Sequence, residues 1–260
     1  MTKFDYSKDE IKQALAKVGL SSGDNVFIHS NLGFFGKLQD AITKDDYCMA
    51  FKESIFDVIG YNGTLAVPAF SYSFCNNEVY DKTKTIGIRG MFSEFIRNDT
   101  KALRSDDANF SIVAIGKNAD YFTKNAPSYS FGPDSFWERF LKHDGKICNF
   151  NFDSGSTFIH YVEKLLKVNY RYDKGFRGKS IINGKEYDGI YYHFVYDLSK
   201  PNNGPDFSKF DKKAKELGLI KTANLGKGQI VCMSSKDIFT LIKNELVINP
   251  TFLIKGNEIV

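Results

Sequence analysis

The stretch 23-GDNVFIHSNLGFFGK-37 has the pattern of a short strand that ends at His29 and Ser30 and runs into a loop with two glycines. Its apolar residues leave no polar face, which is typical of a strand covered on both sides. The stretch 64-TLAVPAFSYSF-74 has the same character and follows an Asn-Gly turn. A helical pattern separates the two strands, and such alternation predicts a sheet with helices packed on it. The sequence therefore predicts an α/β fold around a mainly parallel or mixed sheet.

Capping signals mark the helices beside these strands. Ser7 and Thr43 are each followed three residues later by an acid, which is the spacing of a capping box, and they predict helices over 7–20 and 43–60. Further helices are expected at 90–98, from about 154–157 to 168, at 208–219 and at 234–246, and further strands at 110–116, 146–152, 190–196 and 229–233.

Nothing in the chain divides it into separate domains. The 260 residues contain no internal repeat, low-complexity tract or Pro/Ser-rich linker, so a single domain over 1–260 is expected. Asn183-Gly184 lies between two strand-like stretches and predicts the tip of a hairpin. We therefore expect a hairpin around 179–197 as an addition to that domain.

Composition narrows the setting and the partners. Four cysteines far apart, with no CxxC pair, and a polar amino terminus are typical of a reduced cytoplasmic protein without a signal peptide. The strongest apolar runs are only as long as strands, so no membrane span is expected. Lys and Arg exceed Asp and Glu by 35 to 31, which suits an anionic small molecule and is too weak an excess to indicate nucleic acid. With 24 phenylalanines, an apolar surface is expected, and such a surface makes a homodimer reasonable.

His160 and Glu163 stand three residues apart in 156-STFIHYVEKLL-166. On a helix this spacing places both side chains on one side, next to the apolar face. Three interpretations are open. A neutral histidine near a helix start, held by a carboxylate, is suited to general base catalysis. The same pair is common on an ordinary helix surface, and as a metal site it would supply at most two ligands, so no metal is expected.

Two further places carry chemically useful side chains. His29 ends a strand, and strand ends in α/β sheets line ligand crevices, although a half-buried histidine with a backbone partner explains the residue equally well. In the run 104-RSDD-107, the arginine is suited to a phosphate and the acids to an amine, while charge-rich loops are also common without such a role. His29, Ser71 and Asp107 are the candidate contacts of an amine-bearing substrate.

Five segments together resemble the aminoglycoside 3-N-acetyltransferase family, also called the antibiotic N-acetyltransferase family. They follow the family's order and spacing over roughly residues 10–170, and they are 23-GDNVFIHSNLGFFG-36, 62-NGTLAVPAFSYSF-74, 104-RSDDANFSIVAIG-116, 131-FGPDS-135 and 157-TFIHYVE-163. The resemblance implies a three-layer α/β/α fold. It also implies direct transfer of acetyl from acetyl-CoA to the amine of a sugar-like acceptor.

The resemblance assigns roles to residues as well. It implies that His160 acts as the base at the acceptor amine, with Thr157 and Glu163 beside it as further catalytic residues. It also implies contacts with coenzyme A, here from Ser30, Asn31, Leu32, Arg104 and Ser105.

This chain departs from the family at two corners. Many members follow the Arg-Ser corner with His-Pro, where this chain has Asp107-Ala108, and the usual Ser-Pro is Ser135-Phe136 here. These changes affect the identity of the substrate more than the type of reaction. They indicate a divergent member of the family.

The charge of the chain bears on the acceptor. Aminoglycosides are polycations, whereas this chain is net basic and its acids are not visibly clustered beyond 106-DD-107. We therefore expect an amino sugar carried on a nucleotide diphosphate, as used in building surface polysaccharides, because the diphosphate would pair with lysines and arginines. An aminoglycoside is the alternative acceptor. A non-catalytic protein that binds coenzyme A or a sugar is the alternative of another class, and the retained His160 speaks against it.

Overall fold

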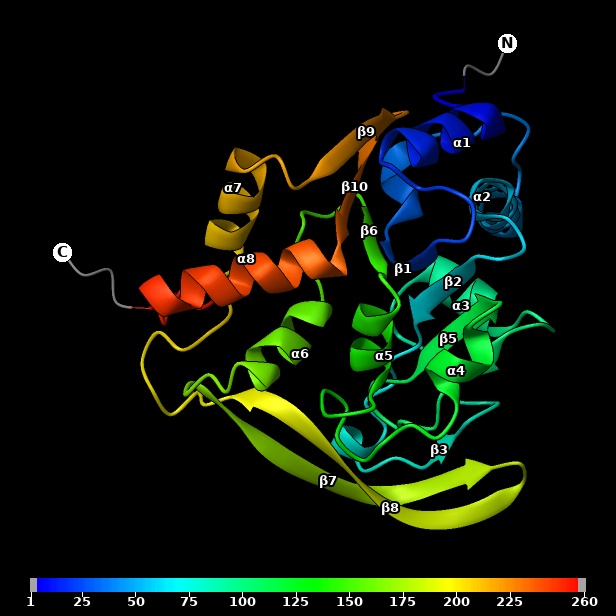
Figure 1. Ribbon diagram of the computed structural model, residues 1–260. Helices are drawn as coiled ribbons and strands as arrows, with labels where there is room; N and C mark the ends of the chain where they lie inside the picture. The colour runs from blue at the N-terminus through cyan, green and yellow to red at the C-terminus, as the bar shows by residue number, and fades with distance from the viewer. Residues whose placement is uncertain (1–3, 257–260) are drawn as a thin grey trace.

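The computed structural model describes residues 4–256. Its centre is a seven-stranded sheet in the order β4 (Leu103–Arg104), β5 (Ile112–Gly116), β2 (Thr64–Pro68), β1 (Asn25–Ser30), β6 (Lys146–Phe150), β10 (Gly228–Ser234) and β9 (Lys221–Leu225). A three-stranded sheet holds β3 (Tyr80–Asp81), β7 (Arg171–Ile182) and β8 (Lys185–Tyr196) (Figure 1). The helices are α1 (Lys8–Lys17), α2 (Lys44–Ile59), α3 (Met91–Arg97), α4 (Ala119–Thr123), α5 (Phe136–Lys142), α6 (Phe158–Leu165), α7 (Ser208–Glu216) and α8 (Ser235–Ile248), with short 3₁₀ turns η1 (Leu32–Phe35) and η2 (Phe74–Asn76).

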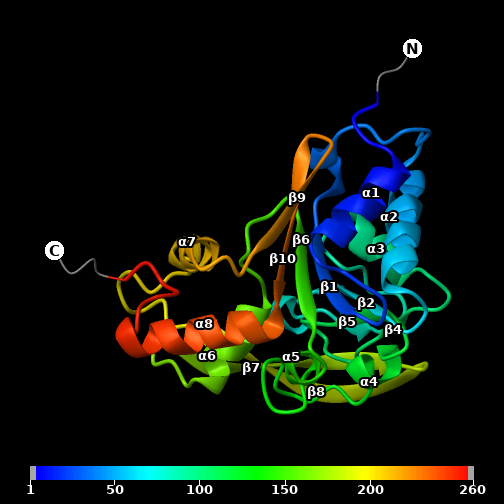
Figure 2. The ribbon, with the colours of Figure 1, turned by 45° about the horizontal axis from the view of Figure 1, so that its top comes forward.

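The middle of the large sheet is buried on both faces. β1 pairs in parallel with β2 on one side and with β6 on the other, and antiparallel strands extend both edges. Val26 and Ile28 pack into a core that includes residues of α1, α2 and α3, whereas Phe27 packs into a second core with residues of α5, α6 and α8. Figure 2 shows α1 and α2 on one side of the sheet and α6 and α8 on the other. The three-layer α/β/α fold with a mixed sheet is confirmed.

The helix starts agree with the capping signals. The Ser7 hydroxyl accepts a hydrogen bond from the backbone N–H of Glu10, and that of Thr43 accepts one from the N–H of Asp46. Each acid in turn accepts a hydrogen bond from the backbone of its capping residue. Both capping boxes therefore form as predicted. Within residues 4–256, none of the helices is long and apolar enough to cross a membrane.

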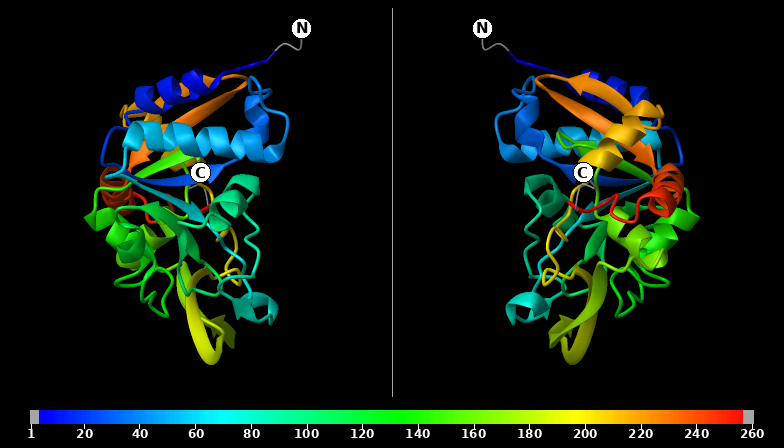
Figure 3. Two further views of the ribbon diagram at one scale, coloured as in Figure 1. Left: turned by 90° about the vertical axis from the view of Figure 1, so that its right-hand side faces the viewer. Right: turned by 90° about the vertical axis from the view of Figure 1, so that its left-hand side faces the viewer.

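The segment after α6 differs from the prediction. The helix ends at Leu165 and not near residue 168, because Lys167 adopts a left-handed φ of +54° that a right-handed helix does not continue through. β7 and β8 then run for 12 residues each, so the hairpin begins at residue 171 and not at 179. Its tip is as predicted, since Asn183 and Gly184 both have the positive φ that a type I′ turn requires. Figures 1 and 3 place this hairpin at the opposite end of the molecule from α1 and β9.

The parallel middle of the sheet determines where a ligand crevice lies. From β1 the chain passes through α2 to β2 on one side, while β6 flanks β1 on the other side. In open α/β sheets, a crevice lies at the carboxyl ends of the strands where the order reverses in this way. His29 and Ser30 end β1 and Phe150 ends β6, so these residues lead into the crevice.

Candidate active site

A cleft of about 950 Å³ opens beside the carboxyl ends of β1 and β6. Its walls come from the end of β1, the loop after β6, the start of α6, α7 and the loop before α3. The lining includes His29, Ser30, Arg89, Asp153, Thr157, His160, Phe207, Asp211, Lys212, Lys215 and Glu216. The cleft therefore joins residues from widely separated parts of the chain.

His160 and Glu163 meet in the wall of this cleft. His160 lies in the first turn of α6, and its Nδ1 is 3.1 Å from Oε2 of Glu163. The histidine side chain is 22% exposed, whereas the glutamate side chain is fully buried, so the carboxylate stands behind the ring. Burial lowers the pKa of His160 and the charge of Arg171 lowers it further, against the opposing effect of Glu163. The ring is therefore neutral at pH 7, as a base must be.

Arg171, the first residue of β7, completes this group. Its Nη2 lies 3.0 Å from Oε2 of Glu163 and 2.7 Å from Nδ1 of His160. The guanidinium carbon lies 3.5 Å from the ring centroid of Tyr196, and Nη1 donates to the carbonyl of Phe194. A buried carboxylate requires a cationic partner, and Arg171, whose side chain is only 2% exposed, supplies it.

Thr157, the residue before α6, contacts the end of β1. Its hydroxyl oxygen lies 3.5 Å from Nε2 of His29 and makes no capping hydrogen bond to its own helix. Burial lowers the pKa of His29 to about 4, and the charge of Arg89 contributes in the same direction. The structure thus brings His29, Thr157, His160 and Glu163 together around one cleft.

The cleft carries charges of both signs. Lys215 and Asp211 form an ion pair of 2.5 Å across one turn of α7. Asp153 and Glu216 make no ion pair with any of the residues that the structure describes. Cations suit phosphate groups and carboxylates suit ammonium groups, so the cleft offers partners for both. Its basic side chains are Arg89, Lys212 and Lys215, and its acidic side chains are Asp153, Asp211 and Glu216.

The three predicted coenzyme A contacts at the end of β1 and just after it have different surroundings. Ser30 lines the cleft, and its hydroxyl is buried with no hydrogen-bond partner within residues 4–256. The backbone N–H of Asn31 donates to the carbonyl of Phe150 at the end of β6. The side chain of Leu32 is 2% exposed and belongs to the core beneath α1 and α2. Ser30 is therefore the one of the three that lines the cleft, although its hydroxyl oxygen is itself covered.

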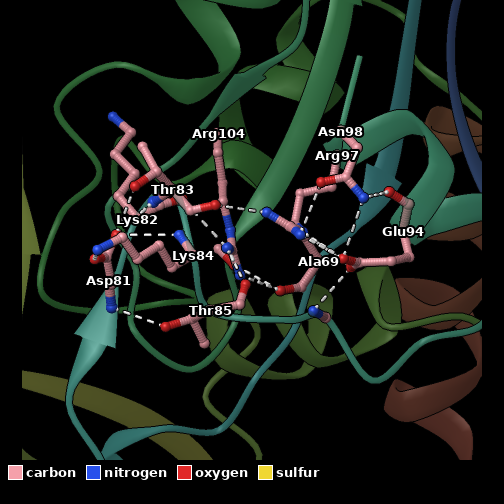
Figure 4. A network of polar contacts seen from close by, with 12 residues as sticks. Ala69, Asp81, Lys82, Thr83, Lys84, Thr85, Glu94, Arg97, Asn98 and Arg104 are labelled. Atoms are coloured by element: carbon pink, nitrogen blue, oxygen red, sulfur yellow. Dashed lines mark hydrogen bonds and ion pairs between the residues drawn. The ribbon is translucent and has the colours of Figure 1, made fainter. Parts of the chain in front are cut away.

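Arg104 lies away from the cleft and holds the loop of residues 82–85 in place (Figure 4). Its nitrogens donate to the hydroxyl of Ser111 and to three backbone carbonyls, and its guanidinium lies over the ring of Tyr80. The carbonyls are those of Ala69, Lys82 and Thr85. The residue is 7% exposed. This buried network occupies the guanidinium that the family resemblance had assigned to coenzyme A.

Ser105, Ser71 and Asp107 are likewise buried away from the cleft lining. The hydroxyl of Ser105 accepts a backbone N–H across the corner, and the hydroxyl of Ser71 donates to the carbonyl of Ala108. The carboxylate of Asp107 accepts two backbone N–H groups of the turn that follows it, and burial raises its pKa. The hydrogen bonds of all three residues therefore stabilise the corner. They differ from the coenzyme A contact predicted for Ser105 and from the substrate contacts predicted for Ser71 and Asp107.

Several cleft residues were absent from the sequence-based candidates. Asp153 follows the central strand β6, so the rule that selected His29 at a strand end would also have found it. No local pattern marks Arg89, Arg171 or the charged residues of α7. Within residues 4–256, no three side chains of His, Cys, Asp or Glu converge in the way that a metal site requires.

Comparison with known proteins identifies the family. The family model described as aminoglycoside 3-N-acetyltransferase matches residues 27–246. A curated relative, aminoglycoside N(3)-acetyltransferase IX of Micromonospora chalcea, is 24% identical over 200 residues, which is 69% of each chain. The solved structure of aminoglycoside acetyltransferase AAC(3)-Xa has a TM-score of 0.81 at 18% identity, over 96% of this chain and 94% of that one. The binary complex of AAC-IIIb with CoASH has a TM-score of 0.78 at 20% identity, over 92% and 96%.

The two solved structures show the same fold, and the match to the family model shows which family the chain belongs to. Its match begins at Phe27 in β1 and ends at Leu246 in α8, and it includes α6 with His160 and Glu163. The chain therefore belongs to the aminoglycoside 3-N-acetyltransferase family and is an acetyl-CoA-dependent N-acetyltransferase.

Proposed function

We propose that this N-acetyltransferase acts on an amine of an aminoglycoside, with His160 as the general base. The observation that carries the proposal is the position of His160 in the cleft wall, backed by the fully buried Glu163. An amine attacks a thioester only in its neutral form, so the reaction needs a base at the acceptor nitrogen. A neutral imidazole accepts the proton, and the carboxylate behind it stabilises the resulting charge.

In this proposal the acceptor nitrogen attacks the carbonyl carbon of acetyl-CoA. The C–N bond forms, the amine proton passes to Nε2 of His160, and the carbonyl oxygen becomes an oxyanion. The oxyanion then collapses, the C–S bond breaks, and the imidazolium returns its proton to the departing thiolate. The hydroxyl of Thr157, which is not used as a helix cap, is the proposed donor to the oxyanion.

The donor end of the cleft is proposed to involve Ser30, Arg89 and α7. Coenzyme A carries phosphate groups, for which Arg89, Lys212 and Lys215 provide cations. The exposed Arg89 is held with its guanidinium 5.1 Å from the ring centroid of Tyr72. We therefore assign to Arg89 the phosphate contact that the sequence had placed at Arg104.

The aminoglycoside is a better-supported acceptor than the nucleotide-linked amino sugar. The net charge of the chain predicts the nucleotide-linked amino sugar. However, the charge of a whole chain says little about one cleft. This cleft holds as many acidic as basic side chains. Asp153 and Glu216, which have no ion pair within the described residues, are proposed to bind ammonium groups of the acceptor. The family model and the curated relative are both named for aminoglycosides.

Thiol release from acetyl-CoA tests the reaction and the acceptor together. The panel contains two aminoglycosides, free amino sugars and nucleotide-linked amino sugars, and the proteins are wild type, His160→Ala and His143→Ala. We expect turnover with the aminoglycosides and at least a ~100-fold lower rate in His160→Ala. Calorimetry should show that this variant still binds acetyl-CoA. His143, exposed at the end of α5, is the matched control and should leave the rate unchanged.

The possible failures of this experiment have different meanings. Turnover confined to nucleotide-linked amino sugars would overturn the proposal that the acceptor is an aminoglycoside, while the proposed acetyl transfer would stand. Loss of acetyl-CoA binding in His160→Ala would mean that His160 has a structural role and not a catalytic one. Wild-type turnover in His160→Ala would remove the residue from the reaction.

A further inference from the structure

Arg171 and Glu163 compete for one ring nitrogen of His160. Nδ1 of the histidine lies 2.7 Å from Nη2 of Arg171 and 3.1 Å from Oε2 of Glu163. Both separations are hydrogen-bond distances. Yet Nδ1 has a single in-plane position, which holds either a proton or a lone pair. A guanidinium only donates and a carboxylate only accepts, so Nδ1 of the neutral ring pairs with one of them at a time.

The state of Nδ1 decides what Nε2 can do, because a neutral imidazole has one protonated nitrogen and one lone pair. When Nδ1 donates to Glu163, Nε2 presents its lone pair and can accept a proton from an amine. We call this the competent tautomer. When Nδ1 accepts from Arg171, Nε2 already carries a proton and cannot act as a base. We call this the blocked tautomer.

The distances favour the blocked tautomer in the free protein. Two N–H groups aimed at one another across 2.7 Å would repel, so the close contact with Arg171 fits an unprotonated Nδ1. Glu163 does not depend on the histidine proton, because its Oε2 already forms an ion pair with Nη2 of Arg171 at 3.0 Å. The guanidinium is also fixed from its other side, by the carbonyl of Phe194 and the ring of Tyr196.

We infer that Arg171 is a positioning residue that holds His160 in the blocked tautomer until the ammonium group of an acceptor enters the cleft. An ammonium group donates an N–H to Nε2, and it finds a lone pair there only in the competent tautomer. Binding of the acceptor therefore shifts the population to the competent tautomer, in which the Nδ1–H turns to Glu163. Without an acceptor His160 cannot activate water, and acetyl-CoA is protected from hydrolysis. The acceptor step rests on the proposed function, whereas the tautomer of the free protein does not.

The other ionisable groups near the ring do not take part in this competition. His29 of β1 is neutral, since its pKa is lowered to about 4. Tyr170 precedes β7 and Tyr196 ends β8, and burial raises the pKa of both phenols above the usual value, which keeps them neutral. The remaining charged groups that line the cleft with His160 are Arg89, Asp153, Asp211, Lys212, Lys215 and Glu216.

Nitrogen-15 spectra of the histidine rings in the free, full-length protein read the tautomer directly, because protonated and unprotonated ring nitrogens resonate far apart. The chain has four histidines, and comparison with His160→Gln identifies the signals of His160. At a pH above the pKa of His160, we expect an unprotonated Nδ1 and a protonated Nε2. A protonated Nδ1 in the wild-type protein overturns the inference without any variant.

Arg171→Met removes both the competing donor and the cation. We expect the tautomer to reverse, with Nδ1–H on Glu163, and His160 to titrate at a higher pH than in wild type, since Arg171 lowers its pKa. Arg177→Met is the matched control: Arg177 is exposed on the same strand, and this variant should keep the wild-type tautomer and titration. An unchanged spectrum in a folded Arg171→Met protein contradicts the inference.

Two further variants keep the test valid if Arg171→Met does not fold with Glu163 left unpaired. Arg171→Lys retains the charge, but its single ammonium group cannot hold Glu163 and Nδ1 with the planar geometry of arginine, so a mixture of tautomers is expected. Glu163→Gln should leave the blocked tautomer in place, because Arg171 and not Glu163 sets it. A reversed tautomer in Glu163→Gln, or the pure blocked tautomer in Arg171→Lys, contradicts the inference.

Thiol release without any acceptor gives a second readout. Hydrolysis of acetyl-CoA should rise severalfold in Arg171→Lys, relative to its rate of transfer, and unchanged hydrolysis would overturn the protective role. If the wild-type protein turns over no acceptor while the spectra are as expected, the proposed function fails and the tautomer assignment stands. If transfer occurs but wild-type Nδ1 is protonated, the proposed function stands and the role of Arg171 fails.

Discussion

The hydroxyl oxygen of Thr157 lies 3.5 Å from Nε2 of His29, so the residue before α6 touches the end of the central strand β1 although 128 positions separate the two. Burial lowers the pKa of His29 to about 4, and the ring is therefore neutral at pH 7. A neutral imidazole orients the hydroxyl without placing a second positive charge beside His160. We therefore propose that His29 positions the group proposed to stabilise the oxyanion.

Thr157→Val tests this hydroxyl, because valine keeps the shape of threonine and removes only the oxygen. We expect kcat to fall about 100-fold, the usual effect of removing one oxyanion donor, with little change in the KM for acetyl-CoA. Initial rates at varied acetyl-CoA measure both constants. Thr157→Ser should retain most of the activity. A Thr157→Val enzyme with the wild-type kcat would exclude the hydroxyl from the chemistry.

The acidic limb of the pH profile should lie below pH 6.5, the ordinary pKa of histidine, because burial and Arg171 lower the pKa of His160. A general base works when neutral, so activity is present above this pKa and is lost as the pH falls through it. Measurements of kcat/KM from about pH 4 to about pH 8 locate the limb. Two acceptors with different amine pKa values provide the control, since a limb that belongs to His160 does not follow the acceptor. A shared acidic limb well above pH 6.5 is the contrary result.

Arg104 and Arg89 should respond in opposite ways to the same substitution. Arg104→Gln removes a buried guanidinium from four hydrogen-bond acceptors, and we expect a loss of about 3 kcal/mol in the free energy of unfolding. The KM for acetyl-CoA should stay near the wild-type value. Arg89→Gln, at an exposed site in the cleft, should raise that KM and leave stability unchanged. A stable Arg104→Gln protein with a raised KM for acetyl-CoA would show that Arg104 contacts coenzyme A after all.

His193 should make the protein less stable in mild acid. It is 4% exposed in β8, and burial lowers its pKa to about 4. The unfolded ring takes up a proton near pH 6.5, so the stability contribution is complete above that pH and declines as the pH falls towards 4. Between pH 7 and pH 5 the loss is about 2 kcal/mol. Urea denaturation at the two pH values measures it.

The variants His193→Gln and His143→Gln separate this effect from the general response to acid. The first removes the buried ring and should reduce the pH dependence by the predicted amount. The second replaces a histidine that is exposed in the folded protein and should keep the wild-type dependence. Equal pH dependence in His193→Gln and wild type would mean that folding does not lower the pKa of His193.

The sequence predicts well those features that depend only on residues close together along the chain. The capping boxes at Ser7 and Thr43 depend on residues three positions apart, and so does the pair His160 and Glu163. The short helices α4 and α5, the strand β9 and the first half of β7 had no prediction. Their sequence patterns are weak, and the reason is clearest in β7. Most of its side chains are exposed, so no alternation of apolar residues marks it as a strand.

Local patterns along the chain were enough to predict the α/β class, the buried central strand and the placement of a histidine and a carboxylate on one side of a helix, because periodicity and capping act over a single turn or strand. Which polar side chains surround that pair depends instead on how distant segments pack in the folded chain. Arg104 and Arg89 are both loop-flanked arginines in the sequence, yet one is desolvated inside a network of carbonyls and the other faces the cleft. Arg171 likewise reaches Glu163 because the turn after α6 brings the first residue of β7 beside that helix. Packing between distant segments sets burial, and burial decides which charges pair and which remain available to a ligand.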